Sequence, residues 1–305
     1  MANKLIYLLL FFFSVSNLYA KELISAQCEP LQESYAEAEQ IKHSQGLLWK
    51  ISKAGTKTSY LYGTIHVSDI EITTLPQPVN KALNESSQFV MEALPDLEQL
   101  SLFSRSMFFN DGTLLSSLVD KPIYDNTKTI LAAYRLGADA VSVMKPWAAF
   151  LLMNYPPDEG EPLDMVLLSL AKQNGSQVAG LETLKEQAKL FSDLSIPEQV
   201  KLLTDTVCHY DQVEQDFQAM KAFYLKRDLE GLFNYAQRFS VEDKPVYEKL
   251  MKKLIEDRNH IMAERMQSFL KQGNAFVAIG AMHLPGKEGV LALLEKQGYS
   301  VSPIY

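Results

Sequence analysis

The chain has 305 residues, of which 47% are hydrophobic and 22% charged, and its formal net charge at pH 7 is -8. A chain of this length can bury a large core in one domain or two. The excess of acidic residues argues against nucleic acid as a partner, because binding to a phosphate backbone depends on many Lys and Arg contacts.

The first twenty residues have the layout of a cleaved secretory signal. Lys4 precedes the apolar run Leu5–Phe13, and a polar stretch follows that ends at Ala20. We expect cleavage after Ala20 and export to the periplasm or the medium. The apolar run is too short to cross a bilayer, which takes roughly 20 apolar residues, and no later segment is longer without charge. We therefore expect no membrane span after signal cleavage.

The two cysteines, Cys28 and Cys208, both lie beyond the predicted signal. An oxidising compartment permits them to pair. A disulfide and two separate thiols both remain open, because the sequence alone does not place the two side chains within bonding distance.

Polar residues 21–46, with a helix-like stretch at Gln32–His43, precede the predicted sheet. Alternating apolar and polar residues in LWKIS and an aromatic, β-branched segment at Ser59–Val67 predict two antiparallel strands joined by the hairpin AGTKT. Four further strands are predicted at Gln88–Ala93, Ser176–Leu181, Ala275–Ile279 and Tyr299–Ile304.

Between the strands the pattern is helical. Helices are expected around Leu83 and at Thr127–Leu136, Pro146–Asn154, Leu163–Gln173, Pro197–Arg238 and Pro245–Lys271. The fold class is therefore α/β: a central mixed sheet in one domain, residues 47–305, with a largely helical cap or insertion at about residues 97–240.

An internal similarity joins the two ends of this domain. The segment YLYGTIH, which contains Gly63 and His66, is echoed by VAIGAMH, which contains Gly280 and His283, and each copy reads as strand, Gly-x-x-His, loop and helix. The glycine permits a turn or a close backbone approach. Such a unit places a histidine at the carboxyl end of a strand, where ligands collect in α/β sheets. The two histidines can meet if their strands are neighbours.

Imidazoles are ligands for zinc, manganese and cobalt, and a catalytic site needs about three protein ligands with one position open. Glu92 ends an apolar strand and is the best third ligand beside His66 and His283. The alternative interpretation of Glu92 is an ordinary exposed acid. The sequence therefore predicts a divalent metal site, with the identity of the ion open.

Glu182 and Arg258 are the predicted catalytic residues. Glu182 also ends a strand. It could be the general base, a further metal ligand or an acid that orients a ligand. It could equally be an ordinary carboxylate in the first turn of the next helix, where the helix dipole favours a negative charge. Arg258, with Asn259 beside it, falls close to the buried face of its helix. An inward arginine must be paired, so it binds a buried carboxylate or supplies positive charge to an oxyanion.

The remaining histidines and nearby acids have simpler interpretations. His209 and His260 are expected to be surface or packing residues. Asp69 and Glu71 are expected to be solvated loop acids, although either could orient His66. The chain contains no His-Glu-x-x-His helix, Gly-x-Ser-x-Gly elbow, phosphate-binding glycine loop or Cys-x-x-Cys pair. This disfavours the zincin and serine-hydrolase classes.

Taken together, LYGTIHV, FVMEA, GLETLKEQ, EDRN and VAIGAMHLPGKEGVLALLEKQGYSV make the chain resemble the TraB/PrgY/GumN family, which includes the Tiki proteases. MKPWAA and the Leu163-Asp164 pair are also similar to family features, and the resemblance extends from Leu47 to Val301. It implies an α/β fold related to the erythromycin esterases, with two Gly-x-x-His elements. By position, His66, Glu92 and His283 match the proposed metal-site residues of the family, and Arg258 matches its helix arginine.

The resemblance implies a metal-dependent hydrolase, most simply a peptidase, with a peptide or protein as substrate. Two alternatives remain open. One is a non-catalytic protein that binds a peptide or haem in the same cleft, since family membership does not establish chemistry. The other is an esterase-like enzyme that uses His66 as a base without metal.

Overall fold

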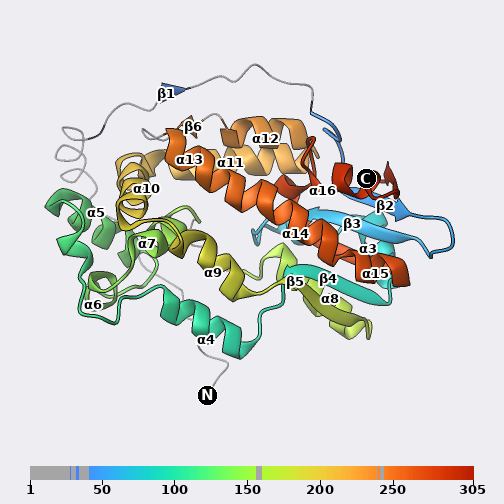
Figure 1. The fold of residues 1–305 in the computed structure, drawn as a ribbon, viewed down its shortest axis with the longest axis horizontal. Helices are drawn as coiled ribbons and strands as arrows, with labels where there is room; N and C mark the ends of the chain where they lie inside the picture. The colour runs from blue at the N-terminus through green and yellow to red at the C-terminus, as the bar shows by residue number, and fades with distance from the viewer. Residues whose placement is uncertain (1–27, 29–31, 34–40, 156–159, 238, 241–243) are drawn as a thin grey trace.

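The computed structural model of the chain describes residues 28, 32–33, 41–155, 160–237, 239–240 and 244–305 (Figure 1). The predicted secretory signal, residues 1–20, lies outside the described residues. So does most of the helix predicted at Gln32–His43. Its first two residues form strand β1 (Gln32–Glu33), which pairs antiparallel with β6 (Phe239–Ser240), so that helix does not begin where the sequence predicted it.

A six-stranded sheet forms the centre of the fold, in the order β5-β4-β7-β3-β2-β8. Its strands are β2 (Leu48–Ser52), β3 (Ser59–Thr64), β4 (Gln88–Ala93), β5 (Gln177–Glu182), β7 (Ala275–Gly280) and β8 (Ser300–Pro303). Strands β5, β4, β7 and β3 run parallel, whereas β2 and β8 are antiparallel to their neighbours. The sheet is therefore mixed, which confirms the predicted α/β class.

The two Gly-x-x-His motifs lie on neighbouring parallel strands. In the pairing of β3 with β7, Gly63 lies opposite Ile279 and Thr64 lies opposite Gly280. The two copies are therefore side by side and offset by one residue. Both strands end at the motif, so His66 and His283 leave the sheet at the same edge.

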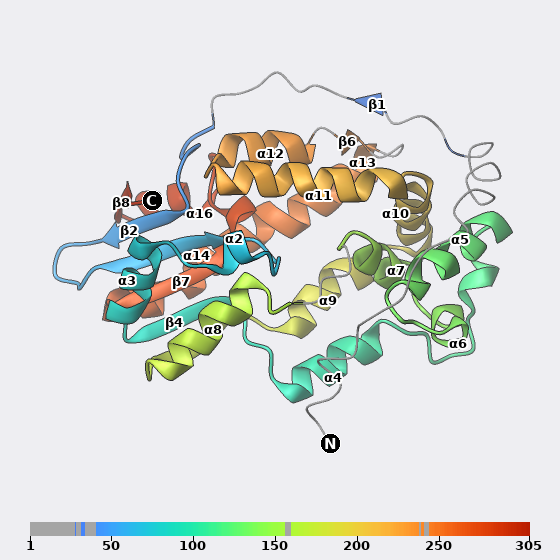
Figure 2. The same cartoon turned by 180° about the vertical axis from the view of Figure 1, so that it is seen from behind.

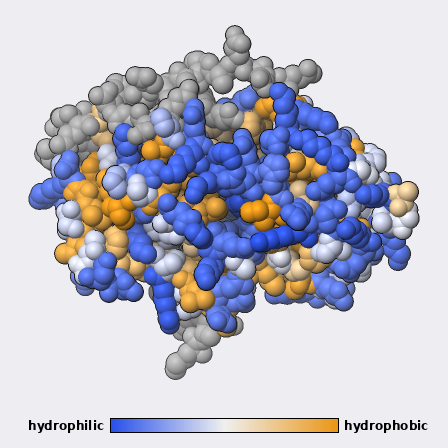
Figure 3. All heavy atoms as spheres, viewed as in Figure 1, coloured by the Kyte–Doolittle hydropathy of each residue, from blue (hydrophilic) through white to orange (hydrophobic). Residues whose placement is uncertain are grey.

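Helices cover both faces of the sheet. They are α2 (Ile70–Thr73), α3 (Gln77–Glu85), α8 (Leu163–Gln173), α11 (Tyr210–Leu225), α12 (Leu229–Gln237), α14 (Arg258–Arg265), α15 (Gln267–Gln272) and α16 (Val290–Lys296). Helices α14 and α15 lie across one face in Figure 1, and α3 and α8 lie across the opposite face in Figure 2. Hydrophilic residues cover most of the outer surface over α14 and α15 (Figure 3), as expected for helices that bury a single apolar face.

A second buried cluster forms a separate helical lobe. Its elements are α4 (Leu97–Ser106), η2 (Leu115–Ser117), α5 (Lys121–Ala132), α6 (Ala138–Ser142), α7 (Pro146–Met153), α9 (Leu184–Ser192), α10 (Ile196–Cys208) and α13 (Lys244–Met251). Trp147 is fully buried there and stacks on Phe191, with ring centroids 5.7 Å apart. Strands β4 and β5 lead directly into α4 and α9, so the lobe adjoins the carboxyl ends of the parallel strands.

The two long helical segments predicted near the carboxyl end are interrupted. Residues 196–237 form α10, α11 and α12, and the break before α12 includes Arg227 at a positive φ of 58°. Residues 244–272 contain a π-helical stretch, η3 (Lys252–Asp257), between α13 and α14. Neither interruption has a proline or glycine at its centre, so nothing in the sequence marks where the helix breaks.

Cys28 and Cys208 form a disulfide with a Cα–Cα distance of 5.5 Å. The bond ties the amino-terminal segment to the end of α10 and is consistent with an exported protein. No helix in the described part of the chain is both long and apolar enough to cross a membrane.

Candidate active site

His66 lies just beyond β3, and its ring is held by a buried carboxylate. The His66 Nδ1 atom is 2.7 Å from Asp164 Oδ2, and Thr64 Oγ1 donates to Asp164 Oδ1 at 2.7 Å. A carboxylate only accepts hydrogen bonds, so Nδ1 carries the proton and Nε2 is the nitrogen left for other partners. Desolvation lowers the pKa of His66, but the charge and the hydrogen bond of Asp164 outweigh it and raise this pKa to about 9.

Asp164 therefore takes the orienting role that the sequence offered to Asp69 or Glu71. Asp69 instead forms an ion pair with Lys221 of α11 at 2.5 Å, and Glu71 is exposed. The sequence marked Asp164 only as part of a Leu-Asp pair in the family resemblance. Its contact with His66 spans 98 residues, and no local pattern predicts such a contact.

His283 lies in η4 (Ala281–His283), a single 3-10 turn directly after β7, and only 4% of it is exposed. Its Nδ1 atom is 2.7 Å from Asn259 Oδ1, and the Asn259 amide nitrogen donates to the Glu288 carbonyl. The amide is thereby oriented so that its oxygen accepts from Nδ1. Burial lowers the pKa of His283 to about 4, so the ring is neutral and its Nε2 atom accepts hydrogen bonds.

Glu92 lies on β4, the strand beside β7, and contacts the second histidine motif. Its Oε1 atom accepts from the backbone N–H of Gly280 at 2.6 Å and lies 3.6 Å from His283 Nε2. Its Oε2 atom accepts from Arg258 Nη2 at 2.5 Å. Burial alone would raise the pKa of Glu92, but the surrounding imidazoles and guanidinium lower it to about 2. Glu92 is thus an ionised carboxylate inside the site.

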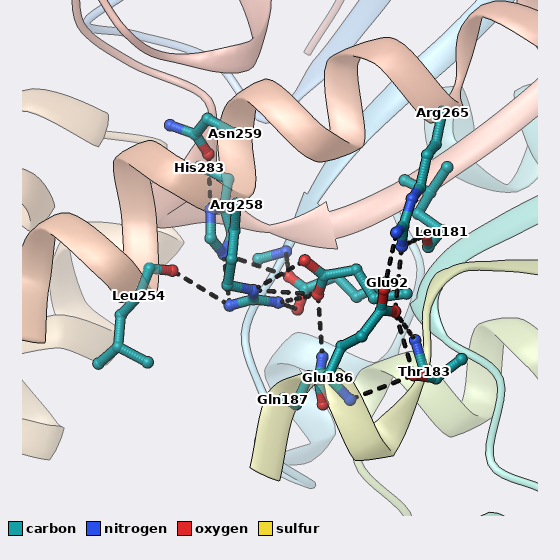
Figure 4. A network of polar contacts seen from close by, with 12 residues as sticks. Glu92, Leu181, Thr183, Glu186, Gln187, Leu254, Arg258, Asn259, Arg265 and His283 are labelled. Atoms are coloured by element: carbon teal, nitrogen blue, oxygen red, sulfur yellow. Dashed lines mark hydrogen bonds and ion pairs between the residues drawn. The ribbon is translucent and has the colours of Figure 1, made fainter. Parts of the chain in front are cut away.

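Arg258 lies at the centre of the polar network (Figure 4). Its Nε and Nη2 groups donate to the Glu182 carboxylate at 2.8 to 3.2 Å, and Nη2 also donates to Glu92. Its Nη1 group donates to the Leu254 carbonyl and to His283 Nε2, both at 3.2 Å. A guanidinium has five N–H groups, and these contacts engage all of them. The predicted pairing of an inward Arg258 with a buried carboxylate is what the structure shows.

The π-helical stretch η3 ends immediately before Arg258. Arg258 and its neighbour Asn259 are both buried, 9% and 1% exposed, although successive residues of an α-helix point about 100° apart. Arg258 reaches the two carboxylates, and Asn259 reaches His283. π-Helical stretches often occur at functional sites, and this one precedes the two helix residues that contact the strand-end groups.

The surroundings of the two motif glycines leave little room for a side chain. A Cβ atom on Gly63 would lie 2.7 Å from the Leu284 side chain and 3.2 Å from Ala281 Cα, so the first motif packs directly on the second. A Cβ atom on Gly280 would lie 3.1 Å from Glu92 Oε1. Neither glycine has a positive φ, so close approach rather than a special turn explains both.

Tyr155 is a further side chain at the site, and the sequence analysis did not identify it. It follows α7 of the helical lobe, and its ring centroid lies 6.4 Å from that of His66. The residue is 45% exposed. Partial burial of its side chain and the negative charges of Glu92 and Asp164 raise its pKa. The sequence places Tyr155 89 residues from His66, without a motif around it.

The donor set of His66, Glu92 and His283 fits a divalent ion in its chemistry. Each imidazole has Nδ1 held by a side-chain oxygen, as is usual for ligating histidines, and Glu92 is ionised. However, no group of three or more His, Cys, Asp or Glu side chains in the described part of the chain is already arranged around one point. Arg258 engages His283 Nε2 and Glu92 Oε2, so an ion there must displace these two contacts.

Of the remaining histidines, His260 is exposed and contacts Glu288, 2.9 Å away, on the surface. His209 caps the start of α11. Both therefore lie on helices outside the network of strand-end groups.

Comparisons with known proteins agree with the resemblance seen in the sequence. The profile of the TraB/PrgY/gumN family matches residues 47–303. Metalloprotease TIKI2 of Danio rerio is 24% identical over 85% of this chain and 61% of its own length. Metalloprotease TIKI1 of Danio rerio is 24% identical, over 83% of this chain and 62% of its own, and TIKI2 of Xenopus tropicalis is 22% identical, over 83% and 59%. The chain thus spans about 60% of these relatives. No solved structure matches.

Proposed function

We propose that this chain, which belongs to the TraB/PrgY/gumN family, is an exported metal-dependent hydrolase that cleaves peptide bonds. One observation carries the proposal. Two histidines from neighbouring parallel strands each have Nδ1 bonded to a side-chain oxygen, and the carboxylate of Glu92 lies 3.6 Å from the Nε2 atom of His283. Relatives named as metalloproteases support the reaction class.

We assign His66, Glu92 and His283 as the residues that hold the ion, with zinc, manganese and cobalt as the candidates. A divalent ion held by such donors lowers the pKa of water and polarises a carbonyl group. Asp164 and Asn259 keep the Nδ1 proton on each ring, so that Nε2 is the nitrogen of each ring that would hold the ion. An ion would take the place of the second proton on His66 and of the Arg258 contact on His283.

Glu182 and Arg258 act as one unit in this proposal. Both oxygens of Glu182 accept hydrogen bonds from Arg258 and are committed to that contact. We therefore assign Glu182 to orienting Arg258 and not to proton abstraction. Arg258 supplies a fixed, largely buried positive charge beside the reacting carbonyl, which favours the negative charge that develops on its oxygen.

Export and a peptide substrate are parts of the same proposal. The predicted secretory signal, residues 1–20, and the Cys28–Cys208 disulfide support a periplasmic or secreted location. The names of the relatives support a peptide or protein substrate. The acidic net charge disfavours nucleic acid.

The contact between His66 and Asp164 favours a second candidate, a hydrolase that uses His66 as general base without metal. An acid that bonds Nδ1 orients the base in many hydrolases. The raised pKa of His66, about 9, weakens this candidate because the ring is then mostly protonated near neutral pH and cannot accept a proton.

A pool of synthetic peptides, analysed by mass spectrometry after incubation with the purified mature protein, tests the proposal. We expect cleavage that a chelator abolishes and that added divalent ion restores. His66→Ala and His283→Ala should be inactive, with unchanged circular dichroism. Activity that survives chelation would favour the metal-free candidate. Absence of all cleavage would refute the proposed function, and a visible absorption band on adding haem would then identify a binding protein.

A further inference from the structure

The proposed reaction needs a hydrogen-bond donor that Arg258 does not supply. When water adds to an amide carbonyl, negative charge develops on the carbonyl oxygen, and a donor aimed at that oxygen lowers the barrier. All five N–H groups of Arg258 are engaged by Glu92, Glu182, His283 and the Leu254 carbonyl. In this arrangement Arg258 contributes charge but no free N–H group, and the two N–H groups that an ion would release point at His283 Nε2 and Glu92 Oε2, the atoms assigned to hold that ion.

Three further polar groups of the site are also engaged. The Gly280 N–H donates to Glu92, the Thr64 hydroxyl to Asp164, and the Asn259 amide nitrogen to the Glu288 carbonyl. Two polar groups at the site have no hydrogen-bond partner among the described residues, His66 Nε2 and the hydroxyl of Tyr155. Because His66 Nε2 is assigned to the ion, the hydroxyl of Tyr155 is the group that a substrate can bind without breaking an existing contact.

Tyr155 comes from a different part of the fold than the strand-end residues. His66, Glu92 and His283 leave the ends of strands, whereas Tyr155 follows α7 and belongs to the helical lobe. The ring of Tyr155 lies 6.4 Å from that of His66, and the residue is 45% exposed, so its side chain faces both the site and the solvent. A peptide bond bound beside His66 would therefore lie close to Tyr155.

We propose that Tyr155 is a further catalytic residue, whose hydroxyl donates a hydrogen bond to the carbonyl oxygen of the scissile peptide bond. This inference rests on the proposed function. The oxygen of water bonds to the carbonyl carbon, and the π-electron pair moves to the carbonyl oxygen, where Tyr155 stabilises it. The pair then re-forms the carbonyl as the C–N bond breaks, and a proton passes from the attacking water to the leaving nitrogen. The products are a carboxylic acid and an amine.

The backbone at Tyr155 is fixed in a way that suits this role. Its carbonyl oxygen accepts from the Tyr134 hydroxyl at 2.8 Å, and the Tyr134 hydroxyl also lies 3.2 Å from that of Tyr210. These contacts anchor Tyr155 to the turn after α5 and to the start of α11. The hydroxyl of Tyr155 takes no part in them, so its removal leaves the anchor intact.

Tyr155→Phe tests the inference, with Tyr124→Phe as a matched control. Tyr124 also lies in the helical lobe and packs under Lys128, far in sequence from the site residues. For the best-cleaved peptide of the pool, we expect Tyr155→Phe to lower kcat by about 10²- to 10³-fold, the usual effect of removing one oxyanion donor. KM should change little, because the hydrogen bond strengthens only as charge develops. The control should match the wild type.

Two readouts that do not depend on turnover accompany the kinetics. A phosphinic analogue of the cleaved peptide, which carries a tetrahedral oxyanion, should bind Tyr155→Phe more weakly by a similar factor. The metal content and the thermal unfolding midpoint of Tyr155→Phe should equal those of the wild type.

Each outcome bears on one claim. Wild-type kcat in Tyr155→Phe, with the wild type active, would overturn the inference and leave the proposed function standing. Equal losses in kcat and in metal content would show that Tyr155 acts through the metal site, which also overturns it. A wild-type protein that cleaves no peptide would refute the proposed function, and the role of Tyr155 with it.

Discussion

The Nδ1 atom of His66 lies 2.7 Å from the Oδ2 atom of Asp164. This contact joins the end of β3 to the first turn of α8 and determines which ring nitrogen of His66 can meet a ligand. The corresponding partner of His283 is a neutral amide, Asn259. The two histidines of the repeated motif therefore differ in charge: the pKa of His66 is raised to about 9 and that of His283 is lowered to about 4.

Asp164→Asn should impair His66 without unfolding the protein. The amide keeps the shape of the carboxylate but removes its charge, so the pKa of His66 in the metal-free protein should fall from about 9, as followed by NMR titration. Peptide cleavage should fall by about 10- to 100-fold, the usual effect of losing a partner of a ligating histidine. Thr64→Val, which removes only the hydrogen bond to Oδ1, is the control and should retain more activity. Equal His66 pKa values in Asp164→Asn and wild type would contradict this prediction.

Arg258→Met should destabilise the fold strongly, because it leaves the buried carboxylates of Glu92 and Glu182 without their shared cation. Breaking a buried ion pair by removing one partner costs about 3–5 kcal/mol, which urea unfolding would measure. The control is Arg265→Met. Arg265 pairs with Glu186 at the surface, and exposed pairs contribute up to about 1 kcal/mol. Similar losses in the two variants would show that the Arg258 network is not buried as described.

Gly63→Ala should lower the free energy of unfolding, because the added methyl would meet Leu284 and the backbone of Ala281. Overpacking of a tight contact costs about 1–3 kcal/mol. Gly137→Ala is the control, since a Cβ atom there meets nothing within 4 Å and the φ of Gly137 is -69°. Thermal unfolding of both variants measures the difference. A harmless Gly63→Ala would argue against close packing of the two motifs.

Glu186 should make the free energy of unfolding depend on pH in the acidic range. The hydrogen bond from Arg265, the largest cause, and those of Thr183 lower the pKa of Glu186 to about 2, from 4.5. A carboxyl group whose pKa is depressed in the folded state stabilises the protein above about pH 4.5, and this contribution is lost as the pH falls toward 2. The difference in unfolding free energy between wild type and Glu186→Gln should therefore shrink from pH 5 to pH 2. Glu256→Gln, at an exposed acid, is the control, and a difference that stays constant with pH would refute this account.

Much of the sheet and part of the site could be predicted from the sequence. The strand at Gln88–Ala93 has the same bounds in the structure, because its apolar run is short and clearly delimited. The two Gly-x-x-His units recur in the same strand-and-helix context, and their strands do lie side by side. Position at strand ends likewise brought Glu92 and Glu182 to one edge of the sheet.

Other features depend on contacts that leave no local pattern. Asp164 and Tyr155 belong to helical segments far along the chain, and only tertiary packing brings them to His66. From sequence proximity alone, Asp69 and Glu71 were the better candidates to orient His66. In the structure, however, Asp69 forms an ion pair with Lys221. The π-helical stretch at Lys252–Asp257 has the composition of an ordinary helix. The engagement of all five Arg258 N–H groups depends on four separate segments and could not be read from any one of them.

The number of divalent ions bound per chain tests the central claim most directly. It can be measured by elemental analysis of the purified mature protein after dialysis against micromolar zinc, manganese or cobalt. We predict one ion per wild-type chain and none in the double variant His66→Ala and His283→Ala, while His260→Ala, at an exposed histidine, retains the ion. A wild-type protein without a bound ion, or a double variant that binds as much as the wild type, would contradict the proposed metal site.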